Sequence, residues 1–168
     1  MVTSARRSRA ERRGEVPAAW LRLLRVHATL TREMDTRLVA SHGLTLSDYE
    51  VLLFLSWAPE RRLRPVDLAQ SVLLTQSGMT RLLAGLERAG LVERSRSASD
   101  GRVVYAVLTD AGMDRLRDAA TTHVHDVHSL FATRFSRQDL GTLAGLLGRL
   151  PGGDVTPTLT HPVRAEDA

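Results

Sequence analysis

Apolar side chains recur every three or four residues in two long segments, one toward each end of the chain. Over residues 17–41 they include Trp20, Leu24, Met34 and Leu38, and over residues 109–132 they include Met113, Leu116, Ala120, Val124, Val127 and Phe131. This spacing predicts amphipathic helices of about six turns each. Pro17 is placed to begin the first helix, and Thr109 is placed to cap the second.

Three shorter helices are predicted between these two segments. Ser47 and Glu50 match a capping box, in which each side chain satisfies a free amide of the first turn. Pro65 stands where the first residue of a short helix is expected. Thr75 is placed to cap a further helix, which Gly90 ends, since glycine adopts the backbone conformation that follows a helix terminus.

Two β-strands follow these helices. The first begins at Leu91, and the second covers Val103 to Leu108, which is rich in β-branched and aromatic residues. Eight residues separate Arg94 from Val103, too many for a tight hairpin, so a projecting loop is expected. Ser136 then caps a final helix through a capping box with Asp139.

The predicted order is four helices, two strands and two helices, which is typical of a winged helix-turn-helix. The fold class is therefore mainly α (α+β), with long N- and C-terminal dimerisation helices. We expect a disordered basic arm over residues 1–16, one domain over residues 17–150 and a flexible tail over residues 151–168. Within the domain, residues 17–41 and 109–150 are the expected dimerisation helices, and residues 44–108 the expected DNA-binding lobe.

Charge is unevenly distributed along the chain. Residues 60–104 carry eight arginines against five acidic residues, whereas residues 17–59 and 105–150 are each balanced. Every basic residue other than histidine is arginine, the forked cation that suits phosphates and base edges. A basic segment that coincides with the predicted helix-turn-helix indicates binding to a polyanion.

Several classes of function are excluded or disfavoured. The chain has no cysteine, so disulfides and thiolate metal sites are excluded. No apolar run approaches the length of a membrane span, and no signal peptide is evident, so a cytoplasmic protein without a membrane partner is expected. No phosphate-binding glycine loop, catalytic triad or metal-ligand motif appears, so we expect neither an enzyme nor a cofactor.

The predicted helix after the turn has small, hydrogen-bonding residues on the side opposite its apolar stripe. In a winged helix-turn-helix this helix enters the major groove of DNA and the wing reaches the backbone or the minor groove. The residues expected to contact bases and phosphates there are Thr75, Gln76, Ser77, Thr80 and Arg81. At the wing, Asp100 is expected to orient Arg102 toward the minor groove. Backbone charge would come from Arg61, Arg62, Arg64, Arg94 and Arg96.

The stretch from residue 74 to residue 112, LTQSGMTRLLAGLERAGLVERSRSASDGRVVYAVLTDAG, resembles the MarR family of bacterial regulators. That family shows an "LE..GLV.R" passage, a "D.R" wing and an "LT..G" opening of the next helix, all matched here without gaps. HGLTLSDYEVL, residues 42–52, is also similar to the family's entry into its second helix. Gly101 departs from the pattern, because many members carry an arginine directly after the wing aspartate.

The resemblance implies a homodimer that represses transcription by binding a pseudo-palindromic double-stranded DNA operator. It also implies a small aromatic or phenolic anion as effector, bound between the dimerisation helices and the DNA-binding lobe. The residues that could line such a cleft are Trp20, Arg25, His27 and Tyr49. For Trp20 and His27, a plain structural role is the competing interpretation.

Two alternatives stay open. The first is a winged-helix protein that interacts with other proteins and does not bind DNA. The second is a metal-responsive regulator using His125 and His128, which share a helix face, whereas His123 and His125 point about 160° apart. A metal site built on two imidazoles requires further ligands from elsewhere in the chain, so we expect the histidines of this segment to be solvated.

Overall fold

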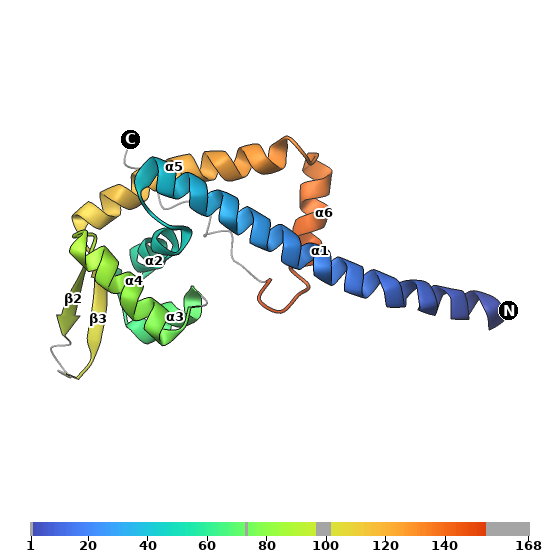
Figure 1. Cartoon of the computed structure of the whole chain (residues 1–168), viewed down its shortest axis with the longest axis horizontal. Helices are drawn as coiled ribbons and strands as arrows, with labels where there is room; N and C mark the ends of the chain where they lie inside the picture. Colours follow the sequence, from blue (N-terminus) through green and yellow to red (C-terminus); the bar gives the residue numbers. More distant parts are fainter. Residues whose placement is uncertain (1, 73, 97–101, 154–168) are drawn as a thin grey trace.

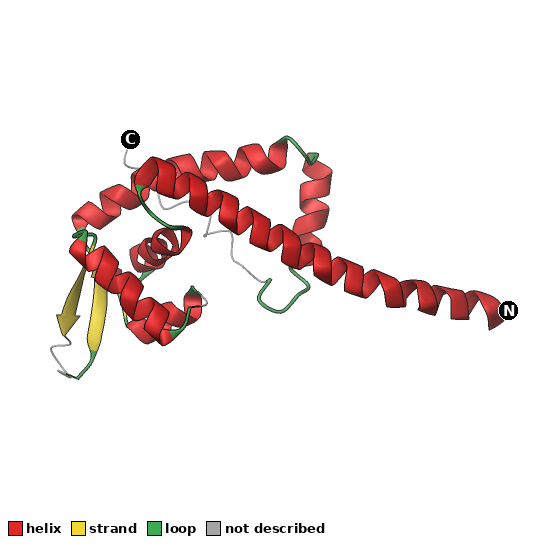
Figure 2. Ribbon diagram, in the orientation of Figure 1, coloured by secondary structure: helices red, strands yellow, loops and turns green. Residues whose placement is uncertain are grey.

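The computed structural model describes residues 2–72, 74–96 and 102–153, and the side chains from residue 14 onward within these ranges. Its elements are α1 (Val2–His42), α2 (Leu46–Trp57), a 3-10 turn η1 (Pro59–Arg61), β1 (Arg62–Leu63), α3 (Pro65–Ser71), α4 (Gln76–Arg88), β2 (Val92–Arg96), β3 (Val104–Leu108), α5 (Asp110–Ala132) and α6 (Arg137–Leu147). Helices dominate, as Figure 2 shows, and the predicted winged helix-turn-helix order is confirmed.

The molecule has two regions. Helices α1 and α5 pack side by side and α6 follows α5 (Figure 1); we call these three helices the rods. Helices α2, α3 and α4 and the strands form a lobe on one side of them, and the first turns of α5 close that lobe. The far N-terminal half of α1 projects beyond the rest of the chain (Figure 1).

The sheet has three antiparallel strands in the order β1-β3-β2. Strands β2 and β3 form the expected wing, with Val92 opposite Leu108 and Arg96 opposite Val104. The sequence did not predict β1, which pairs Arg62 with Val107 over only two residues. A strand this short has no periodicity of its own, so only its pairing with β3 defines it.

Helices α4, α5 and α6 begin where the sequence predicts. Each N-cap side chain accepts a hydrogen bond from the backbone N–H three residues later: Gly78 for Thr75, Gly112 for Thr109 and Asp139 for Ser136. These bonds satisfy amides that the first helical turn leaves without an intrahelical acceptor. Pro65 is likewise the first residue of α3.

Helix α2 begins two residues earlier than predicted. The capping box is formed by Thr45 and Asp48, whose carboxylate accepts from the Thr45 N–H at 2.9 Å, and not by Ser47 and Glu50. Both pairs have the required spacing, but the earlier start follows directly on the turn at Gly43, where φ is +66°. Glu50 is thereby left in the second turn of α2, away from any capping role.

Helix α1 begins at Val2, so the prediction of a disordered arm over residues 1–16 is wrong for its backbone. Pro17 lies inside this helix rather than at its start. Proline removes one intrahelical hydrogen bond and costs about 3 kcal/mol, which is why the sequence suggested a boundary there. The preceding segment, however, is rich in arginine, alanine and glutamate, which favour helix. Most of the expected tail, residues 154–168, lies outside the described residues.

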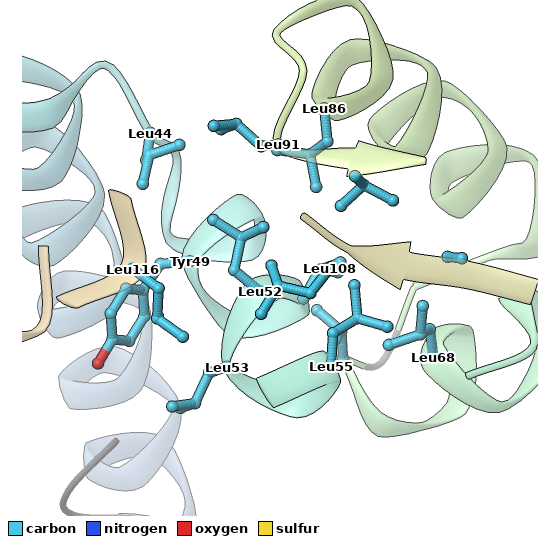
Figure 3. Close-up of a cluster of buried hydrophobic side chains, with 14 of the residues drawn as sticks. Leu44, Tyr49, Leu52, Leu53, Leu55, Leu68, Leu86, Leu91, Leu108 and Leu116 are labelled. Atoms are coloured by element: carbon cyan, nitrogen blue, oxygen red, sulfur yellow. The ribbon is translucent and has the colours of Figure 1, made fainter. Parts of the chain in front are cut away.

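One hydrophobic core fills the lobe. Its largest fully buried side chains come from α2, α3, α4 and α5: Val51, Leu52, Leu55, Leu68, Met79 and Leu116. Figure 3 shows leucines from these elements converging around α2 and the strands, while the hydroxyl of Tyr49 faces away from the labelled leucines. Because every lobe element contributes to this cluster, α4 and the wing are held in fixed relation to each other.

Within the described ranges, no single helix is both long and apolar enough to cross a membrane. Only Gly14–His42 taken together with α2 meets the length and composition of a span, and these two helices meet at a bend of 80°.

Candidate nucleic-acid interface

Helix α4 separates its buried and exposed residues by face. Met79, Leu83 and Leu86 are buried against the lobe core. The five residues that the sequence proposes as DNA contacts all have exposed side chains: Thr75, Gln76, Ser77, Thr80 and Arg81. They lie in the first turn and a half of the helix, where backbone amides point outward and the helix dipole favours negative charge. This end of α4 therefore presents hydrogen-bonding groups and partial positive charge to solvent.

The turn before α4 holds that helix against α3. The Leu74 N–H donates to the Ala69 carbonyl at 2.9 Å, and Leu68 and Ala69 of α3 are buried in the same core as Met79. Gly78 fits this tight entry, because a Cβ there would lie 3.1 Å from the Thr75 hydroxyl oxygen. The exposed end of α4 is consequently fixed by packing on its opposite face.

A hydrogen-bonded junction joins α4, the wing and α5. Gly90 has a φ of +72°, and the Leu91 N–H returns to the Leu86 carbonyl, a Schellman arrangement that ends α4. Thr109 then donates its N–H to the Leu91 carbonyl at 3.2 Å and its hydroxyl to the Gly90 carbonyl at 2.8 Å. A Cβ at Gly112 would lie 2.1 Å from the Leu91 oxygen, so only glycine fits there. These residues are those that carry the sequence resemblance, and their role here is to fix the wing.

The wing tip is only partly described. Asp100 and Gly101 lie outside the described residues, so the expected orientation of Arg102 by Asp100 stays a prediction. Arg102 itself is exposed at the start of the segment that leads into β3. Arg96, at the end of β2, is exposed as well and pairs through its backbone with Val104. The wing thus carries Arg96 at the end of β2 and Arg102 two residues before β3.

Four of the five arginines expected to supply backbone charge form ion pairs: Arg61 with Asp110, Arg62 with Glu60, Arg64 with Asp67 and Arg94 with Glu87. The Arg64 pair is bidentate, at 2.8 and 2.9 Å, and its hydrogen bonds lower the pKa of Asp67. Arg62 also lies 5.0 Å from the centre of the Tyr105 ring. Exposed pairs of this kind contribute about 0–1 kcal/mol, so a phosphate can displace the carboxylate at little cost.

A cavity of about 400 Å³ lies between α2 and α5, on the side of the lobe that faces the rods. Its walls are Leu46, Tyr49, Glu50, Leu53, His123, Val124, Val127 and His128. Of the four residues that the sequence proposes for an effector cleft, Tyr49 is in this wall. Trp20, Arg25 and His27 lie on exposed positions of α1 instead, although the charge of His27 reaches Glu50.

Of the three histidines in α5, only His123 differs from the expectation of solvated side chains. His123 is half-buried, and its ring lies 4.8 Å from that of Tyr49. Burial lowers the pKa of His123 below its ordinary value of 6.5. His125 and His128 are both exposed, and His128 also lines the cavity. Among the residues that the structure describes, no three His, Cys, Asp or Glu side chains converge as a metal site would require.

Comparisons with known proteins agree with this geometry. The model of the MarR family matches residues 42–103 of the chain. The HTH-type transcriptional repressor YetL of Bacillus subtilis (strain 168) is 30% identical over 111 residues, which make up 66% of this chain and 66% of YetL. The match thus spans slightly less than two thirds of that repressor.

Two solved structures from Streptomyces coelicolor extend the likeness over most of the chain. The MarR family transcriptional regulator AbsC is 34% identical, with a TM-score of 0.70 over 78% of this chain and 88% of AbsC. The MarR family transcriptional regulator Sco3205, solved in complex with DNA, is 30% identical, with a TM-score of 0.72 over 79% of this chain and 83% of Sco3205.

Proposed function

This chain belongs to the MarR family of transcriptional regulators, and on that premise we propose that it is a ligand-responsive repressor that binds a pseudo-palindromic operator as a homodimer. The observation that carries the proposal is the exposed polar end of α4, fixed from behind by the lobe core and flanked by an arginine-bearing wing. This is the arrangement in which a helix enters the major groove while the wing reaches outward along the duplex.

Each part of the interface has a distinct role in this proposal. Thr75, Gln76, Ser77, Thr80 and Arg81 contact base edges and phosphates in the major groove. Arg102, oriented by Asp100, enters the minor groove, where a narrow and electronegative site attracts a guanidinium. Arg61, Arg62, Arg64, Arg94 and Arg96 contact the backbone, the paired ones by exchanging a carboxylate for a phosphate.

The exposed apolar face of the rods supports the homodimer. Trp20 in α1 is 57% exposed and Leu146 in α6 is 52% exposed, and Leu24, Leu147 and Leu150 are exposed as well. Such a concentration of large apolar side chains marks an interaction surface. A second copy of the same chain is the simplest partner, because twofold symmetry buries the same face of both copies and repeats α4 along the duplex.

A small molecule in the cavity between α2 and α5 would control DNA binding. The cavity joins an element of the lobe to an element of the rods, and the rods set the spacing between the two copies of α4 in a dimer. An occupant that binds one lobe orientation more tightly shifts the population toward that orientation, and operator affinity changes accordingly.

The test measures how tightly the protein binds DNA fragments from upstream of its own gene. Fluorescence anisotropy over a range of salt concentrations is the readout. Replacing Arg102→Ala is expected to weaken operator binding several-fold and to reduce the slope of log affinity against log salt by about 1. Arg117→Ala is the matched control, because it removes the same charge from an exposed position of α5 that pairs with Asp114. Circular dichroism spectra of both variants should match that of the wild type.

The outcomes separate this proposal from its alternatives. Unchanged affinity in Arg102→Ala would remove the minor-groove role of the wing. Failure of the wild type to bind any upstream fragment at low salt would favour the winged-helix protein that binds other proteins instead. Operator binding that responds to a divalent metal and loses this response in His125→Ala or His128→Ala would favour the metal-responsive regulator.

A further inference from the structure

The cavity between α2 and α5 has a distinctive chemical lining. Leu46, Leu53, Val124 and Val127 form the apolar part of its wall, and the rings of Tyr49 and His123 meet at 45° with their centres 4.8 Å apart. An apolar pocket with a few polar groups is the usual form of a small-molecule site. The two rings and the valines favour a ligand with a flat or bulky hydrophobic body, and the remaining polar groups decide its charge.

Glu50 is the one carboxylate in this wall, and no arginine lines the described cavity; the sequence contains no lysine. Burial raises the pKa of Glu50 above its ordinary value, and the charge of His27 opposes that shift. Burial also raises the pKa of Tyr49 to about 12, so its phenol stays protonated and supplies no charge. A half-buried carboxylate without a guanidinium beside it is stabilised by a cation entering the cavity.

The charged groups next to the cavity wall also include more carboxylates than guanidinium groups. Arg37 is shared between Glu33 at 2.6 Å and Asp126 at 2.9 Å, so two carboxylates surround one guanidinium. The Leu46 N–H donates to the carboxylate of Asp35 at 2.8 Å. Together with Glu50, these contacts place four carboxylates and one guanidinium around this side of α2 and α5. Carboxylates thus outnumber guanidinium groups around the cavity, and the other basic groups there are the imidazoles of His27, His123 and His128.

We propose that this cavity selects an organic cation, an amine carried on an aromatic or other bulky apolar body, with Glu50 as its counter-ion. The proposal rests on the proposed function, since the cation would act as the effector of the repressor. The parts of Tyr49 and His123 that reach the cavity wall then contact the apolar body of the ligand. An aromatic or phenolic anion, which the family resemblance suggested, would instead meet the Glu50 carboxylate in a partly desolvated site.

Three probes of one shape and different charge test this directly. They are (1-naphthylmethyl)ammonium, 1-naphthoate and 1-naphthalenemethanol, which share a ring system and carry positive, negative and no charge. Isothermal titration calorimetry on the full-length protein without DNA measures their affinities. The expected result is that the ammonium binds at least tenfold more tightly than the naphthoate, with the alcohol between them.

Three variants test whether Glu50 causes the preference for the ammonium and whether the probes bind in the cavity. Glu50→Gln keeps the shape of the side chain and is expected to remove the preference for the ammonium while the alcohol binds as before. Asp114→Asn, which removes a carboxylate paired with Arg117 outside the cavity, should leave all three affinities unchanged. Val127→Phe should fill the cavity and reduce binding of all three probes, with thermal unfolding confirming that each variant is folded.

Three results would overturn the proposal: equal or tighter binding of the naphthoate, an ammonium affinity that Glu50→Gln does not change, or no binding of any probe at millimolar concentration. Operator affinity without a probe is measured separately and tests only the proposed function. If the protein binds the ammonium but no DNA, the proposal for the cavity holds and the proposed repressor function fails. If it binds DNA but no probe, the repressor function holds and the proposal for the cavity fails.

Discussion

The lobe and the rods use the same kind of residue in opposite ways. In the lobe, leucines and methionines from four helices are fully buried against one another and against the strands. In the rods, Trp20 and Leu24 of α1 and Leu146 of α6 are exposed, as is Leu150 just after α6. The junction between the two regions is made by the C-terminal end of α1 and the first half of α5, where Leu38 and Leu116 are buried.

This contrast shows which part of the structure one chain can stabilise alone. Burial of apolar surface is the main source of folding free energy, and the lobe buries its apolar side chains within a single copy of the chain. The rods have amphipathic sequences whose apolar residues are only partly covered within the described chain. Their helices gain most of their stability only when those residues are buried. The DNA-reading surface should therefore be robust, and the spacing between two such surfaces should depend on association.

The largest effect is expected from truncating a side chain of the lobe core. Leu52→Ala removes a fully buried side chain from the middle of α2 and should lower the free energy of unfolding by about 2–5 kcal/mol, because a cavity is left behind. Urea unfolding followed by circular dichroism measures this change. Thr121→Ala, at an exposed position of α5, serves as the control and should change stability by less than about 0.5 kcal/mol. Equal effects of the two substitutions would mean that the lobe is not the cooperative unit.

The next effect concerns the rods. Leu24→Glu combined with Leu146→Glu puts charges on exposed apolar positions of α1 and α6 and is expected to convert the proposed dimer into a monomer whose lobe remains folded. Light scattering after size exclusion gives the mass, and the DNA affinity should fall because one lobe binds only half of the operator. Ala111→Glu, at an exposed position in the first turn of α5 where that helix meets the lobe, should leave the mass unchanged. A double variant that stays dimeric would show that another face holds the copies together.

The sequence alone predicts those parts of the fold that depend on local interactions. The N-caps at Thr75, Thr109 and Ser136 and the helix end at Gly90 are each fixed by hydrogen bonds or backbone conformation within a few residues. A local pattern was ambiguous at α2, where Thr45 and Ser47 both have a partner three residues on. Strand β1 could not be found at all, since two residues become a strand only through pairing with β3, more than forty residues away.

The candidate DNA interface and the cavity also differ in how far the sequence alone predicts them. The polar end of α4 lies on one helix, so its exposed residues follow from helical spacing. The cavity combines residues from α2 and α5, and its ring contact joins Tyr49 to His123 across more than seventy positions of sequence. Helical geometry within α5 correctly separates His123 from His125, but nothing in that segment indicates that His123 packs against α2. The sequence assigned Glu50 to a helix cap instead, because a residue that lines a cavity leaves no local pattern in the sequence.

The smallest effect is expected at the boundary between the two regions, where His123 is half-buried. Burial holds its pKa below the ordinary value of 6.5, although Asp126 acts in the opposite direction. The folded protein therefore binds fewer protons at this site than the unfolded chain, so the stability due to neutral His123 is present above pH 6.5 and is lost as the pH falls below it. Replacing His123→Phe keeps a ring against Tyr49 and removes this titration.

The melting temperatures of the wild type and His123→Phe, measured from pH 7.5 downward, isolate this contribution. Their difference should shift in favour of the variant as the pH falls through about 6.5, by no more than a few degrees because the imidazole is only half-buried. Glu50 is the other shifted group in the cavity wall, and its raised pKa has the opposite effect, since its burial cost disappears on protonation at lower pH. Because Glu50 is present in both proteins, it cancels in the difference. A difference that does not change with pH would contradict a lowered pKa of His123 in the folded protein.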